Sequence, residues 1–395
     1  MTFKNFPTAL SKLHKIIPQY AKGSRIYTKD KSYLDFTSGI GALSTGHSHP
    51  LIVNKVNEQL KKSVHLSQQV FLTHEPQIEL TKKLIKIMPS TEIDNFFFTN
   101  SGSEAIDNAI KISRRYTGKT NIISMLGGFH GRTIGALSIT SSNINCKLKS
   151  QPLVPGIFFC NDFTKESLDK IFTYNSDPGE TAAIILEPVQ GEGGIYSVPE
   201  KFLKYVRKVC SENNIILIAD EIQCGSGRTG EWWNVSKKNI SPDMLVFGKG
   251  IASGFQLAGI SSTSEIMNNL GTSYLGGTYG GNCLSVAAAS ATIDIFNDEN
   301  ILKNCNEMGK TIYDELNLID CIKEVRQYGL MIAIEFKDYN LEEIKKIVDN
   351  LRDNNILVLL CGPNSEFIRL LPPLNVNAKE VDEFIAAFKK SISLI

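Results

Sequence analysis

Several features that mark particular classes of protein are missing from this sequence. No two of its eight cysteines are close enough to form a CxxC motif for a metal or a redox pair, so we expect reduced thiols. No apolar run approaches the roughly 18 residues that span a bilayer. A formal net charge of +1 gives no general attraction to nucleic acid or acidic membranes. Any role of basic residues must therefore be local.

The start of the chain lacks the apolar stretch of a secretory signal peptide. Its first 29 residues contain lysines and no acid, which is typical of mitochondrial transit peptides, but they hold only one arginine and an early proline. We expect a cytoplasmic protein, with mitochondrial import as the less favoured alternative.

Length and hydrophobic pattern predict an α/β fold in two domains. A chain of 395 residues exceeds what one hydrophobic core usually supports. Short apolar runs alternate with helical patterns through its middle, which is typical of a mostly parallel sheet covered by helices. The predicted strands of this part are 96–98, 122–125, 182–186, 215–219 and 244–247.

The two ends of the chain follow a different pattern. From residue 298 onward we predict a smaller α+β unit. Its predicted helices are 299–318 and 341–354, and its predicted strands are 322–326, 331–336 and 356–360. Runs at 25–27 and 33–36 predict a hairpin that packs on this unit. We therefore expect an N-terminal segment, 1–45, a large domain, 46–295, and a small domain, 296–395.

Two charged residues beside predicted strands indicate a catalytic site. Lys249 stands between two glycines just after the run 244–247, and Asp220 closes the run 215–219. A lysine in such crowded surroundings can bond covalently to a carbonyl group. An acid at the carboxyl end of a buried strand lies where open α/β sheets bind ligands, and it can keep the ring nitrogen of a pyridine protonated. The pair suggests pyridoxal 5'-phosphate (PLP) as the cofactor.

A helix N-terminus after the first strand of this sheet is a candidate phosphate site. Ser101 and Glu104 have the spacing of a capping box that opens a helix. The free N–H groups of Gly102 and Ser103 would attract an anion, and an ordinary capped helix is the alternative. The glycine-rich loop around Thr278 could also approach a phosphate, or it could be only a turn.

Further candidates follow other predicted strands. The ring of Phe129 could stack on a planar cofactor and the guanidinium of Arg132 could clamp a carboxylate; a buried ring with a surface arginine is the alternative. Glu187 and Glu192 lie on a glycine-containing loop that invites a partner arginine. Arg369 stands among apolar residues, and because an arginine is rarely buried without an anion, its alternative role is a structural salt bridge.

Two other motifs suggest different functions. Residues 225–230 match the G-x-G-x-x-G fingerprint of dinucleotide-binding proteins, but the acids just before them would repel a pyrophosphate, so an NAD-binding oxidoreductase is a remote alternative. His47 and His49 have no further ligands at suitable spacing, so we expect a turn or a helix cap and no metal. His130 is as readily a structural histidine as a functional one.

Together, these motifs resemble those of the class III (ω-amino acid) aminotransferases of PLP fold type I over essentially the whole chain. The matching stretches, in the order of that family, are 100–105, 129–133, 187–194, 220–223, 227–230, Lys249 and 278–282. The resemblance implies a large domain with a mostly parallel seven-stranded sheet covered by helices, and a small α+β domain from the C-terminal and N-terminal segments. A catalytically inactive protein of this fold would be expected to lack Lys249 or Asp220, and both are present.

The resemblance also implies how the cofactor is held. Lys249 would carry PLP and Asp220 would pair with its ring nitrogen. The remaining contacts would come from Gln223 near the ring hydroxyl, from Ser101, Gly102 and Ser103 at the phosphate, and from Phe129 stacked on the ring. Thr278 would reach the phosphate of the neighbouring subunit, which implies a homodimer with shared active sites.

The same resemblance implies ping-pong transamination with 2-oxoglutarate, which yields L-glutamate. Arg369 would bind the α-carboxylate of glutamate, and Glu192 would pair with Arg369 when the amino donor lacks that carboxylate. Arg132 would clamp the carboxylate at the far end of the donor. Ile40 argues against ornithine, because ornithine aminotransferases carry a tyrosine there. We favour 4-aminobutyrate as the donor, with acetylornithine as the alternative.

Overall fold

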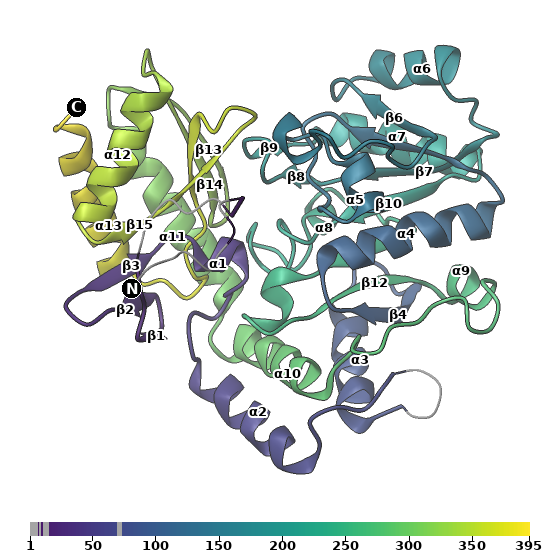
Figure 1. Cartoon of the computed structure of the whole chain (residues 1–395), viewed down its shortest axis with the longest axis horizontal. Helices are drawn as coiled ribbons and strands as arrows, with labels where there is room; N and C mark the ends of the chain where they lie inside the picture. Colours follow the sequence, from purple (N-terminus) through teal and green to yellow (C-terminus); the bar gives the residue numbers. More distant parts are fainter. Residues whose placement is uncertain (1–6, 8, 11–15, 69–72) are drawn as a thin grey trace.

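The computed structural model describes residues 7, 9–10, 16–68 and 73–395, and the chain forms two lobes (Figure 1). Parts of the expected N-terminal segment and of the stretch considered as a transit peptide lie outside the described residues. Within the described ranges, none of the helices combines the length and apolar character that crossing a bilayer requires.

The larger lobe, at the right of Figure 1, is built on a seven-stranded sheet. In spatial order its strands are β4 (Ile93–Thr99), β12 (Ala258–Thr263), β11 (Met244–Phe247), β10 (Ile216–Asp220), β7 (Thr181–Leu186), β5 (Asn121–Met125) and β6 (Ile157–Cys160). Of these seven, β12 alone runs antiparallel to its neighbours. The carboxyl ends of the other six therefore lie at one edge of the sheet.

Helices cover both faces of this sheet because its central strands are apolar on both sides. Every residue of β7, β10 and β11 is buried. Helix α4 (Gly102–Thr117) belongs to the core on one face, with Ile185 and Ile218. Helix α7 (Glu200–Glu212) belongs to the core on the other face, with Ile184 and Leu217. Successive strand residues point to opposite faces, so each strand contributes to both cores.

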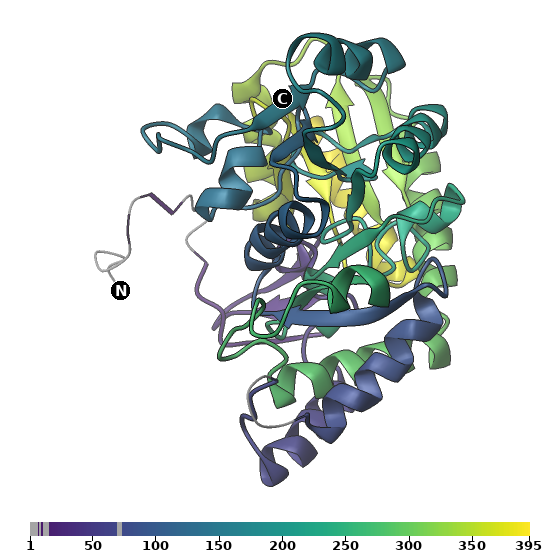
Figure 2. The same cartoon turned by 90° about the vertical axis from the view of Figure 1, so that its right-hand side faces the viewer.

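The remaining helices of the larger lobe surround the sheet. They are α2 (Pro50–Lys62), α3 (Glu75–Ile87), α5 (Ile134–Ile139), α6 (Lys165–Tyr174), α8 (Asn234–Lys237), α9 (Ser264–Asn268) and α10 (Cys283–Asp298). Helices α2, α3 and α10 lie side by side at the bottom of both views (Figure 1 and Figure 2). Buried residues occur on nearly all sides of α10, as expected of a helix packed between others.

The smaller lobe combines two sheets with three helices. One sheet is antiparallel, in the order β13 (Ile322–Tyr328), β14 (Met331–Phe336), β17 (Phe367–Leu370) and β16 (Leu359–Cys361). The other has the order β1 (Tyr20–Lys22), β2 (Arg25–Tyr27), β3 (Ser32–Asp35) and β15 (Ile356–Leu357). Helices α11 (Ile301–Leu316), α12 (Leu341–Asp353) and α13 (Ala378–Ile392) complete it.

All five strands predicted in the middle of the chain are present, and the predicted α/β fold with a mostly parallel seven-stranded sheet is confirmed. Strands β6 and β12 were not predicted. The apolar pattern of β12 is interrupted by Ser261 and Ser262, which are fully buried. Their hydroxyls donate to the carbonyl oxygens of Leu245 and Asp243, and these bonds make polar residues compatible with a central strand.

The predicted N-terminal hairpin is confirmed as β2 and β3, and β3 pairs in parallel with β15. The prediction of a single strand at 356–360 is wrong, because β15 and β16 on either side of Val358 belong to different sheets. Helix α10 continues through residue 295, and the division of the chain at residues 45 and 295 stays a prediction.

Candidate active site

A cavity of about 190 Å³ lies at the edge of the large sheet where β4, β5, β7, β10 and β11 end. It is lined by Ser101, Gly102, Ser103, Phe129, His130, Gly131, Glu187, Asp220, Ile222, Gln223 and Lys249. Nearly all of these residues lie at the ends of parallel strands or on the segments that follow them. The fold therefore gathers five separate segments at the position where open α/β sheets bind ligands.

Lys249 lies just after β11, at the start of a 3-10 turn (Lys249–Ala252). Its φ of 44° is uncommon for a residue with a side chain. Gly250 is required by the packing, because a Cβ there would lie 2.2 Å from the hydroxyl oxygen of Ser44. Burial lowers the pKa of the Lys249 amine, although the nearby carboxylate of Glu192 opposes that shift. A larger fraction of the amine is therefore neutral and nucleophilic.

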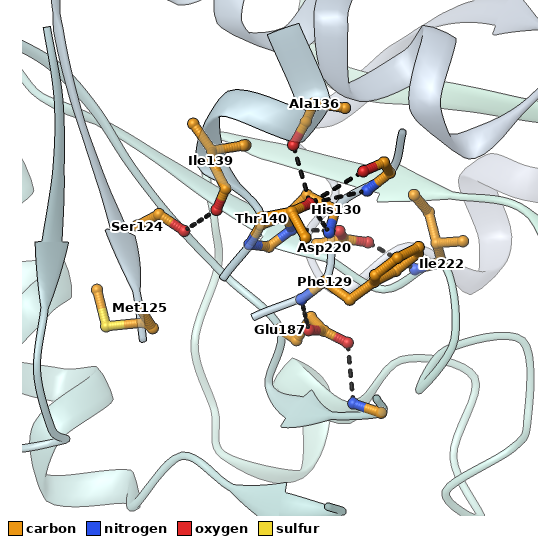
Figure 3. Close-up of polar contacts among 12 residues, drawn as sticks. Ser124, Met125, Phe129, His130, Ala136, Ile139, Thr140, Glu187, Asp220 and Ile222 are labelled. Carbon is orange, nitrogen blue, oxygen red and sulfur yellow. Dashed lines mark hydrogen bonds and ion pairs between the residues drawn. The ribbon is translucent and has the colours of Figure 1, made fainter. Parts of the chain in front are cut away.

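Asp220 ends β10 and is held in place by two hydrogen bonds (Figure 3). Its Oδ2 lies 2.7 Å from Nδ1 of His130, and its Oδ1 accepts from the backbone N–H of Ile222 at 3.1 Å. Both ionisable side chains are almost fully buried. The sequence left the role of His130 open, and the structure shows that it is the partner of Asp220. In the sequence, the one indication that His130 belongs to the site was its position next to Phe129, a predicted cofactor-binding residue.

Glu187 is a site residue that the sequence placed only on a loop. It follows β7 directly, and its side chain is buried. Its two oxygens accept from the backbone N–H groups of Phe129, at 2.7 Å, and Gly191, at 3.0 Å (Figure 3). Burial, together with the charge of Asp220 and against that of His130, raises the pKa of Glu187 to about 7. Glu187 therefore ties the Phe129 segment to the loop that carries Glu192.

The candidate phosphate site is the N-terminus of the 16-residue helix α4. The hydroxyl of Ser101 accepts from the N–H of Glu104 as predicted. The return contact differs from the predicted capping box, since Glu104 accepts from the backbone N–H of Asn100. Gly131, with φ of +138°, lets Ser103 approach, because a Cβ there would lie 2.1 Å from the Ser103 hydroxyl. This arrangement leaves a helix N-terminus beside the cavity, as anion binding requires.

Arg369 and Glu192 form an ion pair next to the cavity. The guanidinium of Arg369, on β17, donates from Nη1 to Oε1 of Glu192 at 2.6 Å and to Oε1 of Gln223 at 3.2 Å. The arginine is 3% exposed and the glutamate side chain 29%. Burial on its own would raise the pKa of Glu192, but Arg369 outweighs it and the pKa is lowered. Gln223 lines the cavity, so it connects this pair to the cavity.

Besides Glu192 and Arg369, which pair next to this cavity, three predicted site residues do not line it. Arg132 is exposed, with its guanidinium carbon 5.7 Å from the ring centroid of Phe129. Ile40 is 49% exposed and lies in the segment α1 (Ser38–Gly41). Thr278 is exposed on the loop before α10. All three lie on the surface of the single chain.

The motifs for the other functions have structural roles or lack the required context. After the glycine pattern 225–230, the next helix, α8, begins only at residue 234, whereas the dinucleotide fingerprint must open a helix. His49 caps α2 by accepting from the N–H of Leu51, and Nε2 of His47 lies 2.9 Å from Oδ2 of Asp35. The described residues contain no group of three potential metal ligands.

The cavity fits PLP in each of its chemical parts. A buried amine with a lowered pKa, a buried carboxylate, an aromatic ring and a helix N-terminus all border one space. These groups match the carbonyl, the ring nitrogen, the ring face and the phosphate of that cofactor. The fold and the site together therefore define a class of enzyme that uses PLP to act on amines.

Comparison with known proteins agrees with this class. Residues 8–392 match the model of the family described as aminotransferase class-III. The chain is 35% identical to the 5-aminovalerate aminotransferase DavT of Pseudomonas putida, covering 98% of this chain and 96% of that protein. It is 36% identical to the 4-aminobutyrate aminotransferase GabT of Escherichia coli, covering 95% and 93%. An acetylornithine aminotransferase of Archaeoglobus fulgidus is 35% identical, covering 94% of each.

A solved structure shows the same fold. The transaminase from the marine bacterium Virgibacillus superposes with a TM-score of 0.91 at 27% identity, covering 96% of this chain and 93% of that one. The chain belongs to the class III aminotransferase family. It is a PLP-dependent aminotransferase, and the predicted enzyme class and cofactor are confirmed.

Proposed function

We propose that this enzyme transfers the amino group of an ω-amino acid, with 4-aminobutyrate as the favoured donor, to 2-oxoglutarate. The products are the semialdehyde and L-glutamate, formed in two half-reactions at one site. The observation that carries this proposal is the Glu192–Arg369 ion pair beside the cavity. It offers a cation for a substrate with an α-carboxylate, and it neutralises that cation for a donor without one.

In this scheme the residues of the cavity hold the cofactor and move one proton. Lys249 would bond to its carbonyl carbon, and Asp220 would pair with its ring nitrogen. Phe129 would stack on its ring, Gln223 would lie near the ring hydroxyl, and Ser101 to Ser103 would hold the phosphate. When bound, PLP supplies an electrophilic carbonyl and a ring that accepts electron density from the substrate carbon. Nζ of Lys249 would take the proton from that carbon and deliver it to the carbon that had carried the carbonyl oxygen, and the carboxylate of Asp220 would keep the ring nitrogen protonated.

Two arguments support an ω-amino acid as the donor: the names of the relatives and the predicted substrate contacts. The names of relatives at 35–36% identity include 4-aminobutyrate, 5-aminovalerate and acetylornithine aminotransferases. All three donors carry a terminal amine or δ-amine and a carboxylate far from it, which Arg132 would clamp, while Ile40 borders the carbon chain. Acetylornithine is the second candidate. A panel of 4-aminobutyrate, 5-aminovalerate, acetylornithine, ornithine and β-alanine with 2-oxoglutarate decides between them by kcat/KM.

A homodimer with shared active sites is part of the proposal. Thr278 is exposed on the single chain and stands apart from the cavity, as expected if it completes the phosphate site of a second copy. Sedimentation equilibrium gives the assembly. In a mixture of Lys249→Ala and Thr278→Ala subunits, the mixed dimers contain one site that carries both changes and one that carries neither, so activity should return.

The role of Arg369 provides the decisive test. Arg369→Ala should slow the half-reaction with 2-oxoglutarate by about 100-fold, since a charged hydrogen bond to a carboxylate contributes roughly 1.5–3 kcal/mol. The half-reaction with the ω-amino donor should change far less. Single-turnover measurements with each substrate separate the two. Equal losses in both halves would refute the assignment.

A further inference from the structure

A second buried arginine faces the same loop as Arg369. Arg326 on β13 is opposite Ala333 on β14, and Ala333 is opposite Arg369 on β17. Residues directly opposite one another in an antiparallel sheet lie on the same face. The two arginines therefore flank the small side chain of Ala333 in one row of the sheet. They are 6% and 3% exposed.

Each arginine of this row contacts a different part of the loop 191–194. Arg369 holds the side chain of Glu192, as described above. Nε of Arg326 donates to the carbonyl oxygen of Gly194 at 2.8 Å. The backbone of the loop is also held from a third side, because the carbonyl oxygen of Glu192 accepts from the N–H of Gly362 at 2.9 Å. The backbone carbonyl groups of Glu192 and Gly194 are thus both tied to the smaller lobe.

The guanidinium of Arg326 is itself held in one orientation. Nη1 donates to Oε2 of Glu335 at 2.7 Å. The guanidinium carbon lies 4.4 Å from the ring centroids of both Tyr196 and Phe367, and these two rings stand at 81° to each other. Arg326 therefore sits in the corner between two perpendicular rings. Only a planar, forked cation can pair with Glu335, contact both rings and still donate to Gly194.

The loop has little room to rearrange around this contact. Gly194 has φ of +119°, and a Cβ at this position would lie 2.9 Å or less from ring atoms of Phe367 and Tyr196. The backbone next to Glu192 is therefore packed against the same two rings that hold Arg326. The side chain of Glu192 is 29% exposed, and from this backbone it forms the ion pair with Arg369.

We propose that Arg326 is a positioning residue that holds the Glu192 carboxylate opposite Arg369 and thereby sets the preference between ω-amino donors and 2-oxoglutarate. This inference rests on the proposed function, because it assigns Arg326 to the pair that accepts two unlike substrates. If the hydrogen bond from Arg326 to Gly194 is lost, the loop moves more freely and the Glu192 carboxylate pairs with Arg369 for a smaller fraction of the time. Arg369 then has no anionic partner when the ω-amino donor binds. When a dicarboxylate binds, it competes less with Glu192 for Arg369.

The test is Arg326→Lys in the PLP-loaded enzyme. Lysine keeps the charge beside Glu335 but lacks the fork that reaches Gly194. We expect kcat/KM for the ω-amino donor to fall by about fivefold, within the range of mutations that act through a neighbouring element. For 2-oxoglutarate it should stay the same or rise. The dissociation constant of glutarate, an unreactive dicarboxylate, should fall by a similar factor in calorimetry.

Lys323→Met is the matched control. Lys323 is on the same strand, three residues before Arg326, and pairs with the other oxygen of Glu335 at 2.6 Å. Its side chain is exposed. The Lys323→Met substitution removes a positive charge next to Glu335 and should leave the rates of both half-reactions within about twofold of the wild type. Tyr196→Leu, at a half-exposed ring, should shift the preference in the same direction as Arg326→Lys by a smaller factor.

Hydrogen exchange gives a second readout that does not depend on activity. Amides of residues 189–197 should exchange faster in Arg326→Lys than in the wild type and in Lys323→Met. Equal changes in both half-reactions, or unchanged exchange in a folded Arg326→Lys enzyme, would overturn the proposal. If the wild type reacts with none of the ω-amino donors, the proposed function fails, whereas exchange at 189–197 still decides whether Arg326 holds the loop.

Discussion

Removal of Glu192 should separate the two half-reactions in the direction opposite to removal of Arg369. In Glu192→Ala the Arg369 guanidinium keeps its hydrogen bond to Gln223 but loses its only anion among the contacts described for it. An ω-amino donor then places apolar carbon beside an unpaired buried cation, which is costly. A dicarboxylate, by contrast, no longer has to displace a competing carboxylate.

The size of the effect follows from the geometry of the pair. The contact is 2.6 Å long, between an arginine that is 3% exposed and a glutamate side chain that is 29% exposed. A hydrogen bond between charged groups in such a setting contributes about 2 kcal/mol. At about 1.4 kcal/mol for each tenfold change in rate, kcat/KM for the donor should fall by about 30-fold. The value for 2-oxoglutarate should be unchanged or up to about tenfold higher.

Single-turnover absorbance measurements on the PLP-loaded enzyme provide the assay, with each substrate added alone. Glu192→Gln is the companion variant, since it keeps the volume and a hydrogen-bond acceptor but not the charge, and it should show an intermediate loss with the donor. The reasoning would be wrong if Glu192→Ala lost more activity with 2-oxoglutarate than with the donor, or lost both equally.

Three further predictions follow from the same structure. Lys249→Ala should abolish transamination and the absorbance near the visible edge that PLP gives the wild type; a wild type that stays colourless with PLP would contradict the role of Lys249. Because the pKa of Glu187 is raised from 4.5 to about 7 in the folded state, its contribution to the free energy of unfolding should fall by roughly 3 kcal/mol as pH rises from about 4.5 to about 7. Urea unfolding of the cofactor-free protein should show this slope in the wild type and not in Glu187→Gln, and identical slopes would exclude it. Ile40 has φ of 68°, so Ile40→Gly should raise stability by about 1 kcal/mol and lower kcat/KM for the donor; a loss of stability in the same urea assay would count against strain at this position.

Local sequence patterns were sufficient to predict much of the fold. The apolar runs that became β7, β10 and β11 are buried on both faces, so no polar residue obscured them. The start of α4 was predicted from Ser101 because a helix cap depends on residues a few positions away. Strand β12 was missed because the hydrogen-bond acceptors of its buried serines are carbonyl oxygens on and beside a neighbouring strand, which the local sequence does not reveal.

The site residues divide in the same way. Lys249, Asp220 and the residues at the start of α4 could be identified because each follows a predicted strand of a parallel sheet, and such strands end at one edge. Their partners could not be identified. His130 reaches Asp220 across 90 positions of the chain, and Glu187 reaches the Phe129 N–H across 58. Nothing next to either residue in the sequence indicates these contacts.

The order of residues along the chain was enough to identify the chemical groups at the sheet edge, and with them the family and the cofactor. Which charged side chains pair with one another depends on the folded chain. Glu192 and Arg369 are 177 positions apart, and Arg326 reaches Gly194 across 132. These contacts exist because the small sheet places two arginines on one face, against a loop of the larger lobe. Such a pairing depends on strand register and lobe packing, which no short stretch of sequence encodes.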